Sequence, residues 1–325
     1  MGVLVSRFLG PRQTRIPLMK LEGIITPLIT PLLARDRLDV EGLECLVEHM
    51  IAGGIHGIFA LGSTGEGPNL SYRLRAELVQ RLCQIVKGRV PILVSVTDTA
   101  FEESLKMSQV AAEAGADAVI LATPYYFPAG QTELIQYVEN IIAELALPTV
   151  LYNMPSLTKV WFEVETLKTL AAQDRILGVK DSSDDLEYYS ELCGLCSLRP
   201  DWSFLIGPED KLIQSISLGG NGGVNGGANL FPRLFVDAYN AAVSKDQLRS
   251  SLLQRKIEAL GEIYAIGHYA SRFIKGTKCA ASLLGLCNDF MAEPFNRFYP
   301  EDRTKVAAIL EKLNPNSNET TSTHA

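Results

Sequence analysis

The sequence contains no long uninterrupted apolar run, and this absence limits where the protein can work. No segment offers the roughly 18–20 consecutive apolar residues that span a bilayer, so we expect no membrane-spanning helix. Basic residues are also scarce, because 30 Lys and Arg stand against 37 Asp and Glu and leave a net charge of −7. Binding of nucleic acid requires a basic patch, and we expect no nucleic-acid partner.

Cysteine is sparse and irregularly spaced. Six cysteines occupy positions 45, 83, 193, 196, 279 and 287, all inside apolar segments. We interpret them as reduced core residues of a cytoplasmic protein. Cys193 and Cys196 form a single C-x-x-C pair, whereas a structural zinc site would need a second pair. Their helical spacing in a leucine-rich stretch favours a packing role.

The two ends of the chain differ from the rest. Residues 1–20 carry four basic side chains and no acidic one. A weak organellar targeting peptide or a myristoylated N-terminus would fit this composition, but we favour an N-terminal extension that is disordered or loosely docked. Residues 314–325 are polar and hold no apolar side chain larger than alanine, which predicts a disordered tail.

Between these ends, short apolar segments alternate with helical patterns. Each apolar segment has the length and the Val, Ile, Leu or aromatic content of a buried parallel strand. The eight segments are 23–31, 57–64, 91–97, 118–126, 148–155, 176–183, 204–210 and 222–231. In 71–87 and 132–145 the apolar residues recur three and four positions apart, which predicts amphipathic helices with Ser71 and Thr132 as N-caps.

Eight strands that alternate with helices are compatible with two α/β architectures. One is an open doubly wound sheet, and the other is a closed (β/α)8 TIM barrel. The barrel fits better, because the units have similar lengths and no break to a second domain interrupts them. We predict the barrel over 21–232 and additional C-terminal helices packed on it over 233–313. The helical patterns after the last strand are 233–243, 246–266, 268–286 and 301–313.

A single lysine stands at the end of the sixth apolar segment. Lys180 follows Ile176-Leu-Gly-Val179 and precedes Asp181-Ser-Ser183, so it lies where a buried strand emerges. Burial disfavours the ammonium form, and the neutral amine can attack a carbonyl to form a Schiff base. An ordinary strand-end lysine that extends into water is the alternative.

The other predicted strands also end in chemically unusual residues. The active site of a (β/α)8 barrel lies at the C-terminal ends of its strands. At those ends the sequence has Gly62-Ser-Thr-Gly-Glu66, Pro124-Tyr-Tyr126, Tyr152-Asn-Met-Pro155, Gly207-Pro-Glu-Asp210 and the glycine-rich stretch 219–227. Each motif alone could be a turn, a buried aromatic residue or a phosphate-binding loop. Their common position at one rim favours one functional site.

Two of these motifs suggest specific chemistry. The glycines of 62–66 let backbone N–H groups approach a carboxylate, and the hydroxyls between them can relay protons. Tyr152 could give and take a proton at a carbinolamine on Lys180, unless it is only a buried aromatic residue. The glycine-rich eighth strand lacks G-x-G-x-x-G spacing, so we expect it to approach a substrate chain rather than a phosphate.

Three motifs together resemble the dihydrodipicolinate synthase / N-acetylneuraminate lyase family. They are Gly62-Ser-Thr-Gly-Glu66, Tyr152-Asn-Met-Pro155 and the strand-end Lys180, and the resemblance covers about residues 21–313. It implies a pyruvate-dependent class I aldolase on a (β/α)8 barrel. No metal and no cofactor are expected beyond the covalent Schiff base on Lys180. A homotetramer built as a dimer of dimers is also implied.

The resemblance assigns a role to each matching residue. Lys180 would form the Schiff base with the 2-oxo acid, and Tyr152 would move protons at the carbinolamine and at the C–C bond. Ser63 and Thr64 would hold the pyruvate carboxylate. Thr64 would also link Tyr152 to Tyr126, which in much of the family comes from the neighbouring subunit.

The residues expected around the substrate tail depart from two subfamilies. Dihydrodipicolinate synthases have an arginine where this chain has Leu157, and a hydrocarbon cannot replace a bidentate carboxylate partner. Sialic acid lyases have an apolar residue there and an Asp-Glu pair after strand seven. Here that pair is reversed as Glu209 and Asp210, and Gly226 stands where the lyases have a hydroxyl.

We predict a Schiff-base aldolase or lyase that cleaves or forms a 2-oxo acid with a hydroxylated tail, from pyruvate and an aldehyde. Gly207 and Val224 would line the substrate site. N-acetylneuraminate is our leading single substrate. The stretch 66–71 also resembles 2-keto-3-deoxy-sugar-acid aldolases. Dihydrodipicolinate synthase activity is the enzymatic alternative, and a non-catalytic barrel that binds a 2-oxo acid is the alternative of another class.

Overall fold

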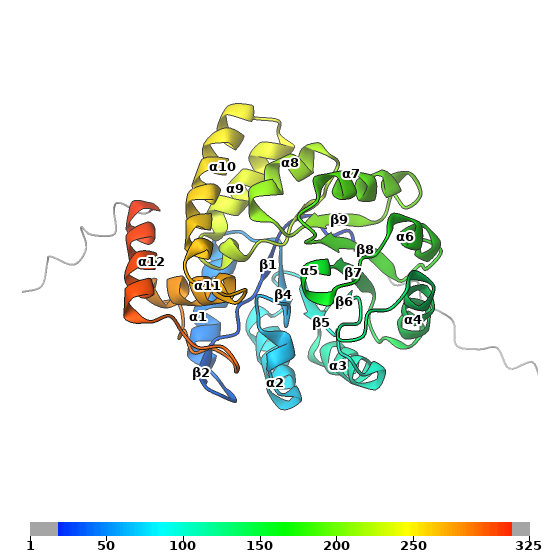
Figure 1. Ribbon diagram of the computed structural model, residues 1–325, viewed down its shortest axis with the longest axis horizontal. Coiled ribbons are helices and arrows are strands. Elements are labelled where there is room, and N and C mark those ends of the chain that lie inside the picture. The colour runs from blue at the N-terminus through cyan, green and yellow to red at the C-terminus, as the bar shows by residue number, and fades with distance from the viewer. Residues whose placement is uncertain (1–18, 314–325) are drawn as a thin grey trace, which may run out of the picture.

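The computed structural model describes residues 19–313, in which eight parallel strands close into a barrel ringed by helices (Figure 1). The strands are β1 (Gly23–Pro27), β4 (Gly57–Ala60), β5 (Ile92–Ser95), β6 (Ala118–Ala122), β7 (Thr149–Asn153), β8 (Ile176–Asp181), β9 (Ser203–Ile206) and β10 (Gly222–Gly223). β10 pairs with both β9 and β1, which closes the barrel. The predicted (β/α)8 fold is confirmed, and the open sheet is excluded.

The strands are buried on both faces, as their continuous apolar runs predict. Side chains that point inward form one cluster, and those that point outward pack under the helices in a second, larger one. The inner cluster includes Ile25, Phe59, Leu93, Ile120, Val150, Tyr152, Leu205 and Val224. Barrel strands that fill their own interior leave no central pore, so the chemistry must lie at the strand ends.

Each predicted strand segment corresponds to one strand, and the strands are shorter than the segments; β9 begins at Ser203, one residue before its predicted segment. The largest difference is in 222–231, where β10 has only two residues and is followed by the 3₁₀ helix η4 (Gly226–Asn229). Successive glycines add no side chains to a sheet, so this segment pairs only briefly before it turns.

Helices surround the barrel (Figure 1). They are α1 (Val40–Ala52), α2 (Tyr72–Val86), α3 (Phe101–Ala114), α4 (Gln131–Glu144), α5 (Pro155–Thr158), α6 (Val164–Leu170), α7 (Leu186–Gly194), α8 (Leu212–Ser217) and α9 (Pro232–Val243). The short helix α5 lies over the strand ends in the middle of the view (Figure 1). Ser71 caps α2 as predicted, since its hydroxyl accepts from Leu74 N. The prediction for Thr132 is wrong. The N-cap of α4 is Gly130, whose N–H donates to the Glu133 carboxylate at 2.8 Å.

Further helices follow the barrel and lie on one side of it (Figure 1). They are α10 (Gln247–Gly261), the 3₁₀ helix η5 (Glu262–Ala265), α11 (Arg272–Leu283) and α12 (Pro300–Leu313). α10 packs on α9, and α11 packs against both η4 and α12. The division at 232/233 stays a prediction. The predicted tail 314–325 and nearly all of the predicted extension 1–20 lie outside the described residues.

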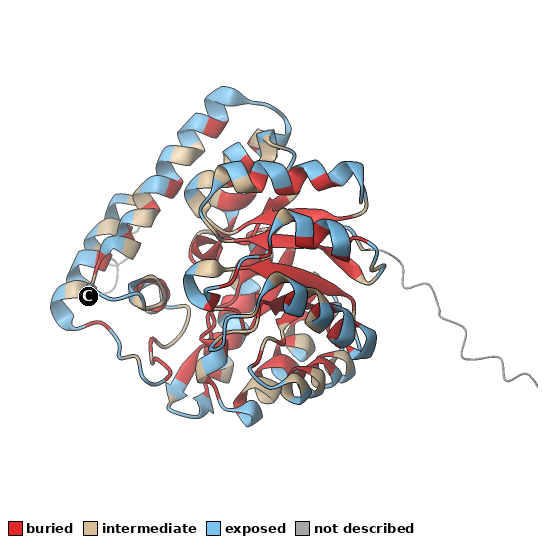
Figure 2. Cartoon of the chain, turned by 45° about the vertical axis from the view of Figure 1, so that its right-hand side comes forward, coloured by how far each residue is buried: buried red, intermediate tan, exposed pale blue. Residues whose placement is uncertain are grey.

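Figure 2 shows a buried sheet and helices that expose one face. The six cysteines are free; Cys193 and Cys279 are buried, but Cys45 and Cys196 are exposed. The prediction that all are core residues is therefore wrong for these two. On α1, Leu43, Leu46 and Val47 face the barrel, so the helical period turns Cys45 to the opposite side. No helix among residues 19–313 is long and apolar enough to cross a membrane.

Candidate active site

Lys180 and Tyr152 lie side by side at the C-terminal ends of neighbouring strands. They are register partners in the parallel pair β7–β8, which explains why two motifs so far apart in sequence meet. Lys180 Nζ lies 3.5 Å from the centroid of the Tyr152 ring and 5.9 Å from that of Phe59. Both side chains are buried, with 4% of Lys180 and 6% of Tyr152 exposed. Lys180 is therefore not a surface lysine that extends into water.

The electrostatic setting favours the reactive forms of both groups. Burial lowers the pKa of Lys180, and negative charge on Tyr152 or Asp181 offsets this only in part. Burial alone would raise the pKa of Tyr152, but the Lys180 charge and hydrogen bonds to Lys180, Ser182 and Ser63 outweigh it and lower that pKa. A lysine that loses its proton more easily is a better nucleophile towards a carbonyl.

Ser182 makes the hydrogen bond to the lysine. Lys180 Nζ donates to Ser182 Oγ at 2.9 Å. The residue between them points away from the site, since the Asp181 carboxylate accepts from Asn153 Nδ2 at 2.8 Å and from Ser183 Oγ at 2.9 Å. Ser182 was not among the predicted site residues. Side chains alternate along an extended strand, so residues two apart share a face, and this alternation could have identified it.

The loop that follows β4 brings backbone N–H groups to the same rim. Among residues 19–313, the N–H groups of Ser63 and Thr64 have no protein acceptor. The loop turns tightly, because a Cβ atom at Gly67 would overlap the carbonyl of Leu61. Two unpartnered N–H groups beside a lysine can bind a carboxylate. A hydrogen bond from the Ser63 hydroxyl of this loop helps to lower the pKa of Tyr152.

A cavity of about 160 Å³ opens beside Tyr152. Its apolar walls include Leu61, Ala122, Met154 and Leu157, and its polar groups include Ser63, Ser95, Thr97, Tyr125 and Arg75. Arg75 is paired with Asp98 at 3.1 Å. Leu157, a predicted substrate-binding residue, lies in the wall of this cavity. The cavity therefore offers hydroxyl groups and apolar surface to a bound molecule, and a guanidinium that is already neutralised.

Tyr126 does not reach Tyr152 within this chain. Its side chain is 83% exposed, and its ring lies 5.0 Å from that of Phe127, measured between centroids. Its backbone has a φ of 83°, which a non-glycine residue seldom adopts. In this conformation the aromatic side chain of Tyr126 points into solvent and not towards Tyr152 of its own chain.

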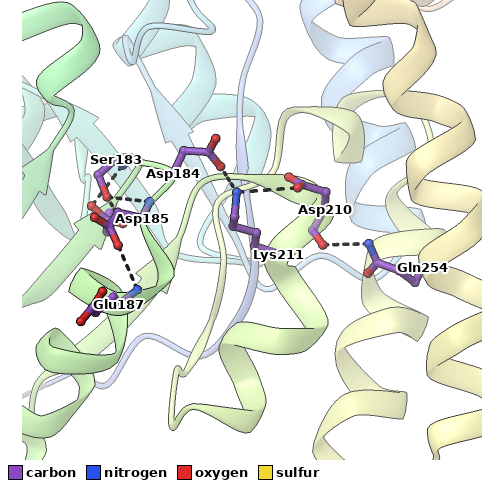
Figure 3. A network of polar contacts seen from close by, with 8 residues as sticks. Ser183, Asp184, Asp185, Glu187, Asp210, Lys211 and Gln254 are labelled. Atoms are coloured by element: carbon purple, nitrogen blue, oxygen red, sulfur yellow. Dashed lines mark hydrogen bonds and ion pairs between the residues drawn. The ribbon is translucent and has the colours of Figure 1, made fainter.

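Glu209 and Asp210 are turned to other contacts. The Glu209 carboxylate accepts from Gly227 N at 2.6 Å and from the Tyr264 hydroxyl at 3.2 Å, and burial raises its pKa to about 7. Asp210 is exposed and pairs with Lys211, and its carbonyl accepts from Gln254, as Figure 3 shows. Neither residue lines the cavity.

The other predicted residues lie close to the reactive pair. Val224 is buried in the inner cluster that also contains Tyr152. Gly207 lies against Ser182, since a Cβ atom at Gly207 would overlap the Ser182 hydroxyl. In the described part of the chain, no group of three or more His, Cys, Asp or Glu side chains could hold a metal ion.

A (β/α)8 barrel with a buried lysine and tyrosine at its C-terminal rim defines a class I aldolase, and the chain is an enzyme of the carbon–carbon lyase class. Residues 20–313 match the sequence model of the Dihydrodipicolinate synthetase family. The chain therefore belongs to that family, as the three motifs had indicated.

Individual relatives are similar over nearly their whole length. The probable 2-dehydro-3-deoxy-D-pentonate aldolase YjhH of Escherichia coli is 31% identical over 90% of this chain and 97% of its own. The solved dihydrodipicolinate synthase of Bacteroides thetaiotaomicron is 47% identical, with a TM-score of 0.88 over 91% of this chain and 99% of its own. The structure of YagE from E. coli K12 in complex with pyruvate is 28% identical, with a TM-score of 0.86 over 90% and 98%.

Proposed function

We propose that the protein is a pyruvate-dependent aldolase that forms a Schiff base on Lys180 and cleaves or forms a 2-keto-3-deoxy sugar acid. The observation that carries the proposal is the buried Lys180 Nζ, 3.5 Å from the centroid of the Tyr152 ring. A relative named as a 2-dehydro-3-deoxy-D-pentonate aldolase and a structural neighbour solved with pyruvate support it.

In the cleavage direction, the neutral amine of Lys180 attacks the C2 carbonyl of the 2-oxo acid. Tyr152 donates a proton to the carbinolamine hydroxyl, which leaves as water, and an iminium ion remains. This cation withdraws electrons from C3 while a base removes the proton of the C4 hydroxyl, and the C3–C4 bond breaks to give an enamine and an aldehyde. We assign that base to Tyr152. Protonation at C3 and hydrolysis then release pyruvate and free Lys180.

The carboxylate of the 2-oxo acid binds the loop 62–66 in this proposal. The unpartnered N–H groups of Ser63 and Thr64 support the assignment, because oriented backbone donors in a buried site bind anions strongly. They also fix the C2 carbonyl in front of Lys180, which converts an encounter of two molecules into a reaction within one complex.

The tail of the substrate occupies the cavity beside Tyr152. The hydroxyl groups of Ser95, Thr97 and Tyr125 support a hydroxylated tail. N-acetylneuraminate, our leading candidate from the sequence, becomes less favoured. The carboxylate of Glu209, which should bind its sugar hydroxyls, is already engaged by Gly227 and Tyr264. A shorter 2-keto-3-deoxy pentonate or hexonate does not need a hydrogen bond from Glu209.

Dihydrodipicolinate synthase activity is the second candidate, because the similar Bacteroides structure carries that name. It requires a partner for the semialdehyde carboxylate. Leu157 stands in the cavity wall where the synthases have arginine, and Arg75 is already paired with Asp98. For this reason we rank it below the sugar-acid aldolase.

We also propose that the enzyme is a cytoplasmic homotetramer in which Tyr126 completes the site of a neighbouring subunit. The exposure and strained backbone of Tyr126 support this arrangement. The six free cysteines agree with a reducing compartment.

The test is reductive trapping followed by an aldehyde screen. The protein is incubated with pyruvate and borohydride, and the adduct is located by peptide mass spectrometry. We expect a reduced pyruvyl adduct on Lys180 that Lys180→Ala abolishes. Pyruvate with glycolaldehyde or glyceraldehyde should then give the five- or six-carbon 2-keto-3-deoxy acid. A folded protein that binds pyruvate but forms no adduct would support the non-catalytic 2-oxo-acid-binding barrel.

A further inference from the structure

Ser182 contacts the lysine directly and lies on the same face of the chain. Its backbone N–H donates to Asn153 O at 2.9 Å, which continues the β7–β8 ladder past the end of β8. The side chain of Ser182 therefore points to the same side as that of Lys180, two residues earlier. The 2.9 Å hydrogen bond from Nζ to Oγ follows from this register.

The neighbouring strand leaves room for this hydroxyl. Gly207 follows β9, and its N–H donates to Asp181 O at 2.7 Å, so the backbone comes close to β8. A Cβ atom on Gly207 would overlap the Ser182 Oγ. The glycine has a negative φ, so its backbone conformation does not require glycine. Glycine is required at position 207 because a side chain there would occupy the space of the Ser182 hydroxyl.

The same hydroxyl also acts on the tyrosine. A hydrogen bond from Ser182 to Tyr152, like the one from Ser63, contributes to the lowered pKa of the tyrosine. A serine hydroxyl has one donor and two acceptor positions, so it can accept a proton from one neighbour while it donates to the other. Lys180 also makes a hydrogen bond to Tyr152, so the three side chains form one cluster, in which a proton can pass from Nζ to the tyrosine through Ser182 as well as directly.

We propose that Ser182 is a catalytic residue that relays a proton between Lys180 Nζ and the Tyr152 hydroxyl. The proposal rests on the Schiff-base function proposed above. When the neutral amine adds to the C2 carbonyl, the nitrogen becomes positive and the carbonyl oxygen becomes negative. Nζ gives a proton to Ser182 Oγ, Ser182 gives its own to Tyr152, and Tyr152 gives one to the oxygen. The neutral carbinolamine forms, and Ser182 and Tyr152 end as they began.

The titratable groups around Ser182 are few. Lys180 and Tyr152 lie on the inner side, and Asp181 lies between them in sequence but on the outer side. Asp181 is engaged by Asn153 and Ser183, and burial raises its pKa. Asp181 therefore does not compete for the proton of Nζ, whose hydrogen-bond partners among the described residues are the Ser182 hydroxyl at 2.9 Å and Tyr152.

The test is the rate of imine formation, measured by rapid quenching of enzyme and pyruvate into borohydride across pH 6–9. We expect Ser182→Ala to slow trapping by about 100-fold, as for the loss of one acid–base group, and to leave the final adduct on Lys180. Ser182→Thr keeps the hydroxyl and should restore the rate to within about tenfold. Ser183→Ala is the matched control, because its hydroxyl bonds to Asp181 and not to the reactive pair.

Gly207→Ala provides a second route to the same question. The added methyl group should displace the Ser182 hydroxyl and slow trapping as Ser182→Ala does, so the test survives if Ser182→Ala does not fold. Wild-type trapping rates in folded Ser182→Ala, or equal losses in the alanine and threonine variants, would overturn the relay. The Schiff-base proposal would still stand in both cases, since it fails only if the wild-type protein forms no adduct.

Discussion

Glu66 and Lys278 form a fully buried ion pair between the loop after β4 and helix α11. Neither side chain has any exposed surface. The second oxygen of Glu66 accepts from Ala292 N at 2.8 Å, and Lys278 Nζ also donates to Phe290 O at 2.7 Å. The loop that carries Ser63 is thereby fixed to the helices that follow the barrel. These helices support the active site from behind, although they contribute no side chain to the cavity.

Lys278→Met should therefore weaken both the fold and the binding of pyruvate. Removal of the lysine leaves Glu66 buried without a charged partner, and such a change destabilises a protein by about 3–5 kcal/mol. We expect a lower free energy of unfolding in denaturant and a raised KM for pyruvate. The double variant Glu66→Gln/Lys278→Met removes both charges and should recover part of the stability. A double variant no more stable than Lys278→Met would contradict this account.

The pair also bears on which lysine reacts. Lys278 is held by Glu66 and by a backbone carbonyl, and it lies in α11 rather than at the end of a barrel strand. Lys180, by contrast, is in an ion pair with no carboxylate of residues 19–313, and its amine meets the Ser182 hydroxyl and the rings of Tyr152 and Phe59. We therefore expect peptide mapping to find the pyruvyl adduct on Lys180.

Glu209 should make stability depend on pH. Its pKa is raised from 4.5 to about 7 by burial, so the folded state holds a proton that the unfolded state has lost. Its contribution to stability is present below about pH 4.5 and is lost as the pH rises through 7. Glu209→Gln is neutral at every pH and keeps an oxygen for Gly227 N. We expect this variant to lose less stability than the wild type between pH 5 and 8.

Denaturant unfolding at several pH values measures this effect. Asp210→Asn is the matched control, because Asp210 is the exposed neighbour of Glu209 and its carboxylate pairs only with Lys211. It should leave the pH dependence of the wild type unchanged. If Glu209→Gln shows the same slope as the wild type, Glu209 ionises at an ordinary pKa and its burial has no energetic effect.

Leu157→Arg should separate the two candidate reactions. The side chain of Leu157 is 53% exposed at the cavity wall, so arginine can be accommodated without a loss of core packing. A guanidinium there can bind the carboxylate of aspartate semialdehyde in a bidentate manner. We expect kcat/KM to rise for condensation of pyruvate with the semialdehyde, and not for condensation with glycolaldehyde. Leu157→Lys adds a positive charge without the paired N–H donors of a guanidinium, so we expect a smaller rise in kcat/KM for the semialdehyde. Equal gains for both aldehydes would show a general effect of charge.

The sequence predicts the barrel and the reactive pair for the same physical reason. Parallel strands covered on both faces need continuous apolar runs, and their C-terminal ends must meet at one rim of the barrel. The sequence alone therefore predicts that Tyr152 and Lys180 lie close together. The contacts of the C-terminal helices could not be predicted from the sequence. Their apolar periodicity gives a buried face but not the partner of that face, and the pairing of Glu66 with Lys278 has no local signal. The same reason explains Glu209, whose position suggested a substrate but whose carboxylate meets Tyr264 of η5.

Tyr126 gives a prediction that depends on assembly. Its exposed side chain cannot complete the site of its own chain, whereas a neighbouring subunit could receive it. Tyr126→Phe should then lower turnover, by about 100-fold or more if its hydroxyl takes part in proton transfer. Lys180→Ala should abolish turnover outright. In a mixed oligomer, a site that takes Lys180 from one variant and Tyr126 from the other is complete.

Mixing the two variants under conditions that exchange subunits tests this directly. We expect turnover well above the sum of the two separate preparations, since each variant supplies what the other lacks. Tyr126→Phe mixed with a Lys180→Ala/Tyr126→Phe double variant is the control, because no combination of these chains contains an intact Tyr126. If the first mixture gains nothing while mass spectrometry shows mixed oligomers, Tyr126 acts within its own chain or not at all. A gain confined to the first mixture would establish that the active site is shared between subunits.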